Sequence, residues 1–242
     1  MKANSQTVFL TAEWRHLAML NYEVEPAVLV PFVPVGTELD SWNGKTFVSV
    51  VGFLFLNTRV RGIPIPFHRD FEELNLRFYV RRRAEDGWRR GVVFIQELVP
   101  RAAIAWVARR FYNENYLALP MAHQIDRAGD AIKSAAYFWR FSGSESFLKI
   151  VTRGVAKELA AGSEAEFITE HYWGYARQRD GSTMEYRVGH PRWRIWEAES
   201  VELHGDTAGL YGPRFGGCLN RSPASAFLAA GSEVIVYAGT RL

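Results

Sequence analysis

The fold is decided by residues 67–121, FHRDFEELNLRFYVRRRAEDGWRRGVVFIQELVPRAAIAWVARRFYNENYLALPM. Within this stretch, residues 73–81 alternate between apolar and polar side chains. Because successive side chains of a β-strand point to opposite faces, such a strand has one apolar and one polar face. The apolar face consists of Leu74, Leu76, Phe78 and Val80, and the polar face of Glu73, Asn75, Arg77, Tyr79 and Arg81. The pattern predicts a strand that packs into a core on one side and presents a row of hydrogen-bonding groups on the other.

The second strand of this stretch, residues 92–99, is almost entirely apolar but contains Glu97. Asp86–Gly87 lies between the two strands and is a favoured hairpin turn, so we predict that the strands are antiparallel neighbours. A hairpin turning there puts position 77 opposite position 96, to within one register step. A buried carboxylate needs a partner or a shifted pKa. We therefore expect the Glu97 carboxylate to contact Arg77 or Arg101 inside the fold.

The rest of the chain is interpreted as strands with a few short helices, in one domain of residues 1–242. Residues 101–112 form the best predicted helix, because their apolar side chains fall on one stripe. Pro26 favours a short helix at 25–33, and residues 57–71 are a loop rich in Gly and Pro. Ser163 with Glu166 resembles a capping box. Further strands are predicted at 16–24, 46–56, 135–142, 145–152, 168–177, 183–189, 192–203 and 233–239.

The composition is typical of a globular protein and argues against several other classes. The chain has 242 residues, of which 48% are hydrophobic, and a net charge of +3 with 24 Arg and 5 Lys. The short arginine clusters at 81–83 and 88–90 favour a solvated hairpin tip over a nucleic-acid surface. Cys218 is the single cysteine, which excludes an intramolecular disulfide. Without a secretory leader or an apolar run of ~20 residues, we expect a cytoplasmic protein with no membrane and no nucleic-acid partner.

Several motifs, in order along the chain, resemble one bacterial family. They are FLTAEWRHLAMLNYEVEPAVLVPFVPVGTELD, VSVVGF, IPFHRDFEELNLRFYV, GVVFIQELVPRAAIA, YNENY and ITEHYWGY. With these motifs the chain resembles the YqjF-type family, DUF2071, which is similar to acetoacetate decarboxylase. The resemblance implies a mainly β fold of α+β type, a closed antiparallel β-barrel or cone with a few flanking helices and a deep pocket. It also implies a homodimer or a higher homo-oligomer.

The resemblance also shows where the decarboxylase chemistry is missing. Acetoacetate decarboxylase works through a lysine that forms a Schiff base, in a lysine pair that follows a proline. The corresponding stretch here is Pro100–Arg101–Ala102, so an arginine and an alanine stand where the lysine pair would be. A guanidinium stays protonated and is a poor nucleophile. Schiff-base decarboxylation is therefore not expected, and Arg101 becomes a candidate for substrate binding.

Another position matches the decarboxylase pocket better. Arg15 falls where that enzyme carries a pocket arginine, ahead of the first short helix, and is a candidate substrate-binding residue. The alternative for Arg15 is a surface ion pair with Glu13 or Glu23. The sequence leaves both interpretations open.

The pocket glutamates of the decarboxylase are matched only approximately. Glu73, or Asn75 on the same strand face, approximates one of them, and Glu97 lies in the strand that leads to the catalytic segment. The alternative for Glu97 is a buried ion pair with Arg77 or Arg101 that joins the hairpin to the following helix. Such a pair would support both a site and the core.

Histidine and metal chemistry have weaker signals. The six histidines show neither HxH nor HExxH spacing, so we expect no metal and no cofactor. His171 lies in the predicted strand 168–177 and is a candidate general base, the alternative being a satisfied core histidine. The leading hypothesis is a small-molecule pocket protein, acting as an enzyme on an organic acid or ketone, with Glu97 or Glu73 as base and arginines binding the acid. The competing hypothesis is a non-catalytic binding or structural protein in which the Arg and Glu side chains only stabilise the fold.

Overall fold

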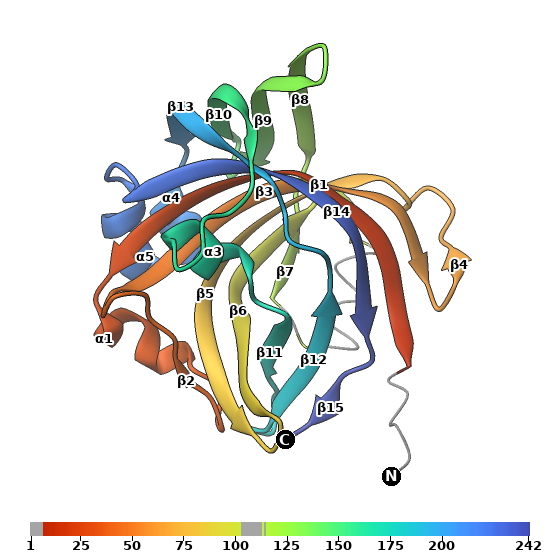
Figure 1. Ribbon diagram of the computed structural model, residues 1–242, viewed down its shortest axis with the longest axis vertical. Helices are drawn as coiled ribbons and strands as arrows, with labels where there is room; N and C mark the ends of the chain where they lie inside the picture. Colours follow the sequence, from red (N-terminus) through yellow and green to blue (C-terminus); the bar gives the residue numbers. More distant parts are fainter. Residues whose placement is uncertain (1–6, 103–112, 114) are drawn as a thin grey trace.

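The computed structural model describes residues 7–102, 113 and 115–242, most of them in β-strands (Figure 1). The mainly β fold predicted from the sequence is confirmed. The predicted helix at 101–112 lies, from residue 103 onward, outside the described residues. The first strands are β1 Val8–Val24, β2 Glu38–Leu39, β3 Thr46–Val60, β4 Ile63–Pro64, β5 Phe71–Ala84, β6 Gly87–Val99 and β7 Tyr116–Ala118. They are followed by β8 Met121–Ala128, β9 Ala131–Phe141, β10 Ser144–Lys157, β11 Trp173–Arg177, β12 Thr183–Gly189, β13 Ile195–His204, β14 Ser225–Tyr237 and β15 Thr240–Arg241. The helices are α1 Pro26–Leu29, the 3-10 helix η1 Val30–Phe32, α3 Glu164–Thr169, α4 Thr207–Tyr211 and α5 Pro213–Leu219.

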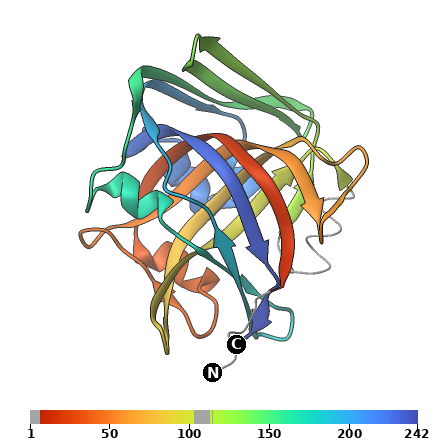
Figure 2. The same ribbon diagram turned by 45° about the vertical axis from the view of Figure 1, so that its right-hand side comes forward.

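The strands form one sheet with the order β15-β12-β11-β6-β5-β3-β1-β14-β13-β10-β9-β8. Strand β12 also pairs with β14, which links two distant parts of this path. Most neighbours are antiparallel, as expected, but β6 runs parallel to both β7 and β11. Parallel neighbours need long crossover connections, and the chain returns to β6 only after such excursions. Both views place β8 and β9 at the end of the molecule opposite the β5–β6 turn (Figures 1 and 2).

The β5–β6 hairpin forms as predicted, but its register differs. Ala84 pairs with Gly87, so the turn is centred on residues 85–86 instead of 86–87. A bulge between positions 76 and 77 then shifts the pairing, and Asn75 faces Glu97 while Arg77 faces Phe94. Position 77 was expected opposite 96. Because directly opposite residues of a strand pair share a face, Glu97 still lies on the polar face of β5.

Strand β5 separates two apolar clusters. Its residues Leu74, Leu76 and Phe78 are fully buried in the first cluster, which also takes in side chains from α1, α4 and α5. Tyr79, on the opposite face, belongs to a second cluster with aromatic side chains from β1 and β3 such as Phe53. Both faces of the strand are therefore covered, and its polar face lies inside the protein.

Two of the other segments that differ from their predictions are the loop at 57–71 and the strand at 168–177. The loop expected at 57–71 is shorter, because β3 continues to Val60 and pairs with β4. A proline is tolerated in β4 because this two-residue strand lies off the main path of the sheet. The strand expected at 168–177 begins only at Trp173, because α3 extends to Thr169. Helix α3 is capped as predicted, since the Ser163 side chain accepts a hydrogen bond from the Glu166 N–H.

A close contact across the sheet gives a first stability prediction. A Cβ on Gly52 of β3 would lie 2.7 Å from Tyr137 Cδ2 of β9, whose hydroxyl donates to the His16 carbonyl at 2.7 Å. Overpacking of a filled core costs about 1–3 kcal/mol, so Gly52→Ala is expected to lower the free energy of unfolding in urea by that amount. Gly217→Ala is the control, because its added Cβ meets nothing within 4 Å. Equal stability of the two variants would contradict the contact.

Candidate functional site

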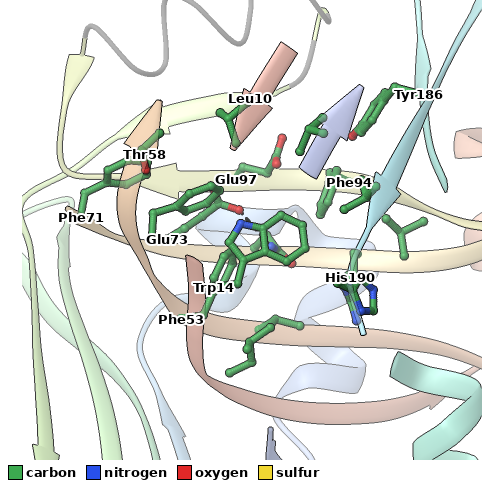
Figure 3. Close-up of a pocket in the computed structure, with 18 of the residues that line it drawn as sticks. Leu10, Trp14, Phe53, Thr58, Phe71, Glu73, Phe94, Glu97, Tyr186 and His190 are labelled. Carbon is green, nitrogen blue, oxygen red and sulfur yellow. Dashed lines mark hydrogen bonds between the residues drawn. The ribbon is translucent and has the colours of Figure 1, made fainter. Parts of the chain in front are cut away.

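A cavity of about 220 Å³ lies against the polar face of β5 (Figure 3). Its walls come from β1, β3, β5 and β6 and from the segments around residues 169–173 and 186–193. The polar side chains at its wall are Thr58, His68, Glu73, Asn75, Arg77, Glu97, Tyr116, Thr169, His171, Tyr186 and His190. Its remaining large side chains are Phe9, Trp14, Phe53, Phe55, Phe71, Phe94, Trp173 and Trp193. Aliphatic side chains complete the wall: Leu10, Leu17, Val51, Val60, Ile65, Val92, Val188 and Val236. The cavity is therefore mostly apolar and rich in aromatic rings, with a polar stripe along one strand.

The polar stripe follows from strand geometry. Glu73, Asn75 and Arg77 alternate with the buried apolar residues of β5, so all three project from the same face. Glu97 of β6 pairs with Asn75 and adds a second carboxylate to this stripe. The structure thus brings together five of the seven residues that the sequence singled out, since His171 also lines the cavity.

Glu73 is a buried carboxyl group with two donors. It is 3% exposed, and it accepts a hydrogen bond from Asn75 Nδ2 at 3.2 Å and one from the Tyr116 hydroxyl at 3.1 Å. Burial raises the pKa of Glu73 to about 7, although these two hydrogen bonds act in the opposite direction. Near neutral pH the side chain is therefore present in both protonation states, as a general acid or base requires.

Arg77 follows Asn75 on the stripe and is 8% exposed. Its Nη2 donates to the Ile168 carbonyl of α3 at 3.1 Å, and its guanidinium lies 5.6 Å from the centre of the Tyr79 ring. Within the described part of the chain, its Nε has no hydrogen-bond partner, and neither does Asn75 Oδ1. A buried donor and a buried acceptor are thus left open at the cavity wall.

The expected contact of Glu97 with Arg77 or Arg101 is wrong. Among the described residues, neither arginine forms an ion pair or hydrogen bond with Glu97. The hairpin turns at residues 85–86, one residue earlier than expected, which places Arg77 opposite Phe94, and its guanidinium reaches the carbonyl of Ile168. The bulge lies beyond Arg77, where the pairing shifts by one residue and Asn75 comes to lie opposite Glu97.

The two other arginines lie away from the cavity. Arg15 Nε and Nη2 donate to Glu13 Oε2 at 2.9 and 2.7 Å, which is the surface ion pair considered as the alternative. Its neighbour Trp14 points into the cavity, and successive side chains of a strand alternate. Arg101 is exposed and is not part of the cavity wall. The substrate-binding roles expected for Arg15 and Arg101 are therefore corrected.

His171 lies between α3 and β11, and it is not on a strand as predicted. It is packed against the rings of Tyr79 at 4.7 Å and Phe167 at 5.3 Å, and its Nε2 is 3.6 Å from Asp40 Oδ2. Burial lowers the pKa of His171 to about 4, although the Asp40 carboxylate acts in the opposite direction. Burial would raise the pKa of Asp40, but its contacts with His171 and Arg90 lower it to about 2. At neutral pH, His171 is an uncharged imidazole beside a carboxylate.

Comparison with known proteins assigns the family. The DUF2071 family model, described as "Uncharacterized conserved protein", matches residues 11–233. The chain belongs to the DUF2071 family. A relative, "Uncharacterized protein YqjF" of Bacillus subtilis strain 168, is 28% identical over 190 residues, 77% of this chain and 75% of the relative.

The fold of this DUF2071 protein is similar to that of solved acetoacetate-decarboxylase-like enzymes. Acetoacetate decarboxylase from Legionella pneumophila has a TM-score of 0.65 at 13% identity, covering 100% of this chain and 92% of that one. The enduracididine biosynthesis enzyme MppR complexed with pyruvate has a TM-score of 0.66 at 11% identity, covering 99% and 93%. At these identities the likeness concerns the fold. The resemblance that the sequence motifs indicated is confirmed for both family and fold.

Lysines of this DUF2071 protein lie away from the cavity wherever the structure describes them. All four lysines in the described residues are exposed, and none lines the cavity. Over the same part of the chain, no group of three or more His, Cys, Asp or Glu side chains is placed to hold a metal ion. No helix there is both long enough and apolar enough to cross a membrane.

Sequence reasoning missed several cavity residues that are distant in the chain. Trp14 is one of them, and it is the neighbour of Arg15, the residue predicted to bind substrate. Because successive side chains of a strand point to opposite faces, Trp14 points into the cavity and Arg15 points away from it. His190 stacks on Trp193 at 4.3 Å, and burial lowers its pKa. The segment that carries His190 lies between β12 and β13, both of which pair with β14, and no local pattern indicates these pairings.

Proposed function

We propose that this protein binds a small organic acid or ketone in the cavity along β5 and acts on it by proton transfer. The observation that carries the proposal is the combination on one strand face of a carboxyl group with a pKa of about 7, Glu73, and a buried guanidinium with an open Nε–H, Arg77. Perturbed groups gathered in a cavity are typical of catalytic sites.

Arg77 supplies the charge that such a ligand needs. A guanidinium forms charge-assisted hydrogen bonds to a carboxylate or an enolate oxygen, and these are strong where water is excluded. Asn75 has an unpartnered buried Oδ1 within the described residues, so it can accept a hydrogen bond from an enol or a protonated acid. Together the two side chains recognise a group with both donor and acceptor character.

Glu73 is the proposed base. Its ionised form removes a proton from the carbon beside a carbonyl, and the electron pair of that C–H bond moves toward the carbonyl oxygen, which Arg77 stabilises as an enolate. The protonated Glu73 then returns a proton to the same carbon. Glu97 and neutral His171 line the same cavity and are the further candidates for proton transfer.

Imine chemistry does not belong to this proposal, because the described lysines lie outside the cavity. Treatment with borohydride in the presence of acetoacetate or pyruvate is expected to leave the mass of the intact protein unchanged. Pyruvate is a fair probe because a solved enzyme of similar fold binds it. A lysine-linked mass increase, located by peptide mapping, would contradict this expectation.

The proposed reaction is tested by deuterium uptake in D₂O. The parent protein is expected to speed exchange of the protons beside the carbonyl in at least one of pyruvate, 4-methyl-2-oxopentanoate and phenylpyruvate, followed by NMR. Glu73→Gln and Arg77→Gln are expected to lose this acceleration, while Arg15→Gln, which changes an arginine outside the cavity, keeps it. Binding without any accelerated exchange would leave the non-catalytic binding protein, and absence of binding would leave a structural role.

A further inference from the structure

The cavity places aromatic rings in register with the polar stripe. In the β3–β5 ladder, Phe53 pairs with Glu73 and Phe55 pairs with Phe71. In the next ladder, Trp14 of β1 pairs with Phe55. Cross-strand partners lie about 4.5–5.5 Å apart between their Cα atoms, so the rings and the carboxyl group share one wall. Figure 3 shows Trp14, Phe53 and Glu73 around the same space.

These rings form a cluster around Trp14. Its indole lies edge-on to Phe53 at 5.5 Å, to Phe55 at 5.8 Å and to Trp193 at 6.4 Å, measured between ring centres. Phe55 and Phe71 stack at 4.7 Å. Offset and edge-on arrangements of this kind are the favourable geometries for aromatic contacts, so a further ring placed here gains the same interactions.

The aromatic end also has polar atoms without partners. Within the described residues, the buried Nε1 of Trp14 and the buried Oγ1 of Thr58 have no hydrogen-bond partner, and both residues line the cavity. A buried indole N–H normally finds an acceptor. At the cavity wall these two groups are available to a ligand that reaches them.

The size of the cavity also suits a ligand that carries an aromatic ring. A cavity of roughly 150 Å³ holds a benzene molecule, and this one has about 220 Å³. Strand positions 73 and 77 are about 13 Å apart at 3.3 Å per residue. A three-carbon acid bound at Arg77 would therefore leave the rings around Trp14 without contact.

We propose that the ligand of this site is an aryl-substituted acid, whose ring lies against Trp14 and Phe53 and whose carboxylate or 2-oxo acid group reaches Asn75 and Arg77. This inference rests on the proposed function and names its substrate class. The ring is recognised by the aromatic wall from β1 and β3, and the acid by the polar stripe of β5. Small aliphatic acids satisfy only the second requirement.

The test is a calorimetric comparison of three 2-oxo acids on the parent protein. Phenylpyruvate carries the ring, 4-methyl-2-oxopentanoate has a bulky aliphatic group, and pyruvate has neither. Phenylpyruvate is expected to bind more tightly than either of the others by on the order of ten-fold. Equal affinity for phenylpyruvate and the aliphatic acids would overturn the ring inference and leave the proposed function standing. Failure of all three to bind would overturn both.

Variants locate the preference within the cavity. Trp14→Leu is expected to lower the affinity for phenylpyruvate much more than the affinity for pyruvate, and so to remove most of the difference between the two. Trp14→Phe keeps an aromatic ring at this position and is expected to retain a large part of the preference for phenylpyruvate over pyruvate. Trp88→Leu is the matched control, because Trp88 is 48% exposed at the hairpin and outside the cavity. A preference that survives in a folded Trp14→Leu protein, checked by circular dichroism, would contradict the assignment of the ring site.

Discussion

Replacement of Glu185 by glutamine is expected to lower the free energy of unfolding by about 3 kcal/mol. Glu185 lies on β12, and its side chain is only 3% exposed. It accepts hydrogen bonds from Arg82 Nε at 2.6 Å and from Arg89 Nη1 at 2.5 Å, one arginine from each strand of the β5–β6 hairpin. Glutamine keeps the size of the side chain but leaves two partly buried guanidinium groups without their shared counter-ion.

The measurement is urea unfolding of Glu185→Gln beside Glu38→Gln. Glu38 also pairs with an arginine of this hairpin, Arg81, but both side chains are about half exposed, at 53% and 42%. Exposed pairs contribute roughly 0–1 kcal/mol, so Glu38→Gln is expected to be nearly as stable as the parent. Equal losses in the two variants would show that burial does not distinguish these pairs.

This network changes the interpretation of the arginine clusters. The sequence suggested that 81–83 and 88–90 are a solvated hairpin tip. Part of that holds, because Arg81 lies over the exposed Trp88 ring at 4.5 Å. Arg89, however, lies 4.2 Å from the Trp173 ring and also binds Glu185. These arginines join the hairpin to β11 and β12. The two strands lie more than eighty residues further along the chain than the hairpin.

The part of the fold that could be predicted was set by local periodicity. The alternation in β5 correctly divided Leu74 and Leu76 from Glu73 and Asn75, because each face meets a different environment. The existence of the hairpin also followed from the turn sequence. Its register did not, because the turn lies at 85–86, one residue before the expected Asp86–Gly87, and a bulge beyond Arg77 then shifts the pairing again.

The candidate site could be predicted where one strand supplied it. Glu73, Asn75 and Arg77 were identified because they share the face of a single strand. Arg15 was chosen by its place in a family pattern, and that criterion cannot tell an inward position from the outward one beside it. Trp14, at the inward position, carried no charged group that would have drawn attention to it.

Glu73→Gln is expected to gain stability relative to the parent as the pH rises from 4.5 to above 7. The pKa of Glu73 is about 7 in the folded protein and 4.5 in the unfolded chain, so between these pH values the folded state holds a proton that the unfolded state has lost. Stability from this proton is complete below pH 4.5 and is lost as the pH rises through 7. At 1.36 kcal/mol per pKa unit, the parent loses about 3 kcal/mol relative to glutamine, which cannot ionise.

The quantity compared is the difference in free energy of unfolding between variant and parent at each pH. This difference is needed because His16 and His171 also titrate in this pH range, and their contribution to stability changes in the opposite direction to that of Glu73. Burial lowers the pKa of each of these histidines to about 4, so their stabilisation is lost as the pH falls below 6.5, and it cancels in the difference. Glu72→Gln is the matched control, since the His123 hydrogen bond lowers the pKa of Glu72. Its stability deficit relative to the parent is expected to shrink as the pH falls, because the stabilising Glu72 carboxylate is lost on protonation. Parallel unfolding curves for Glu73→Gln and the parent across pH 4.5–8 would mean that Glu73 is not held protonated in the cavity, and the proposed proton transfer would then pass to Glu97 or His171.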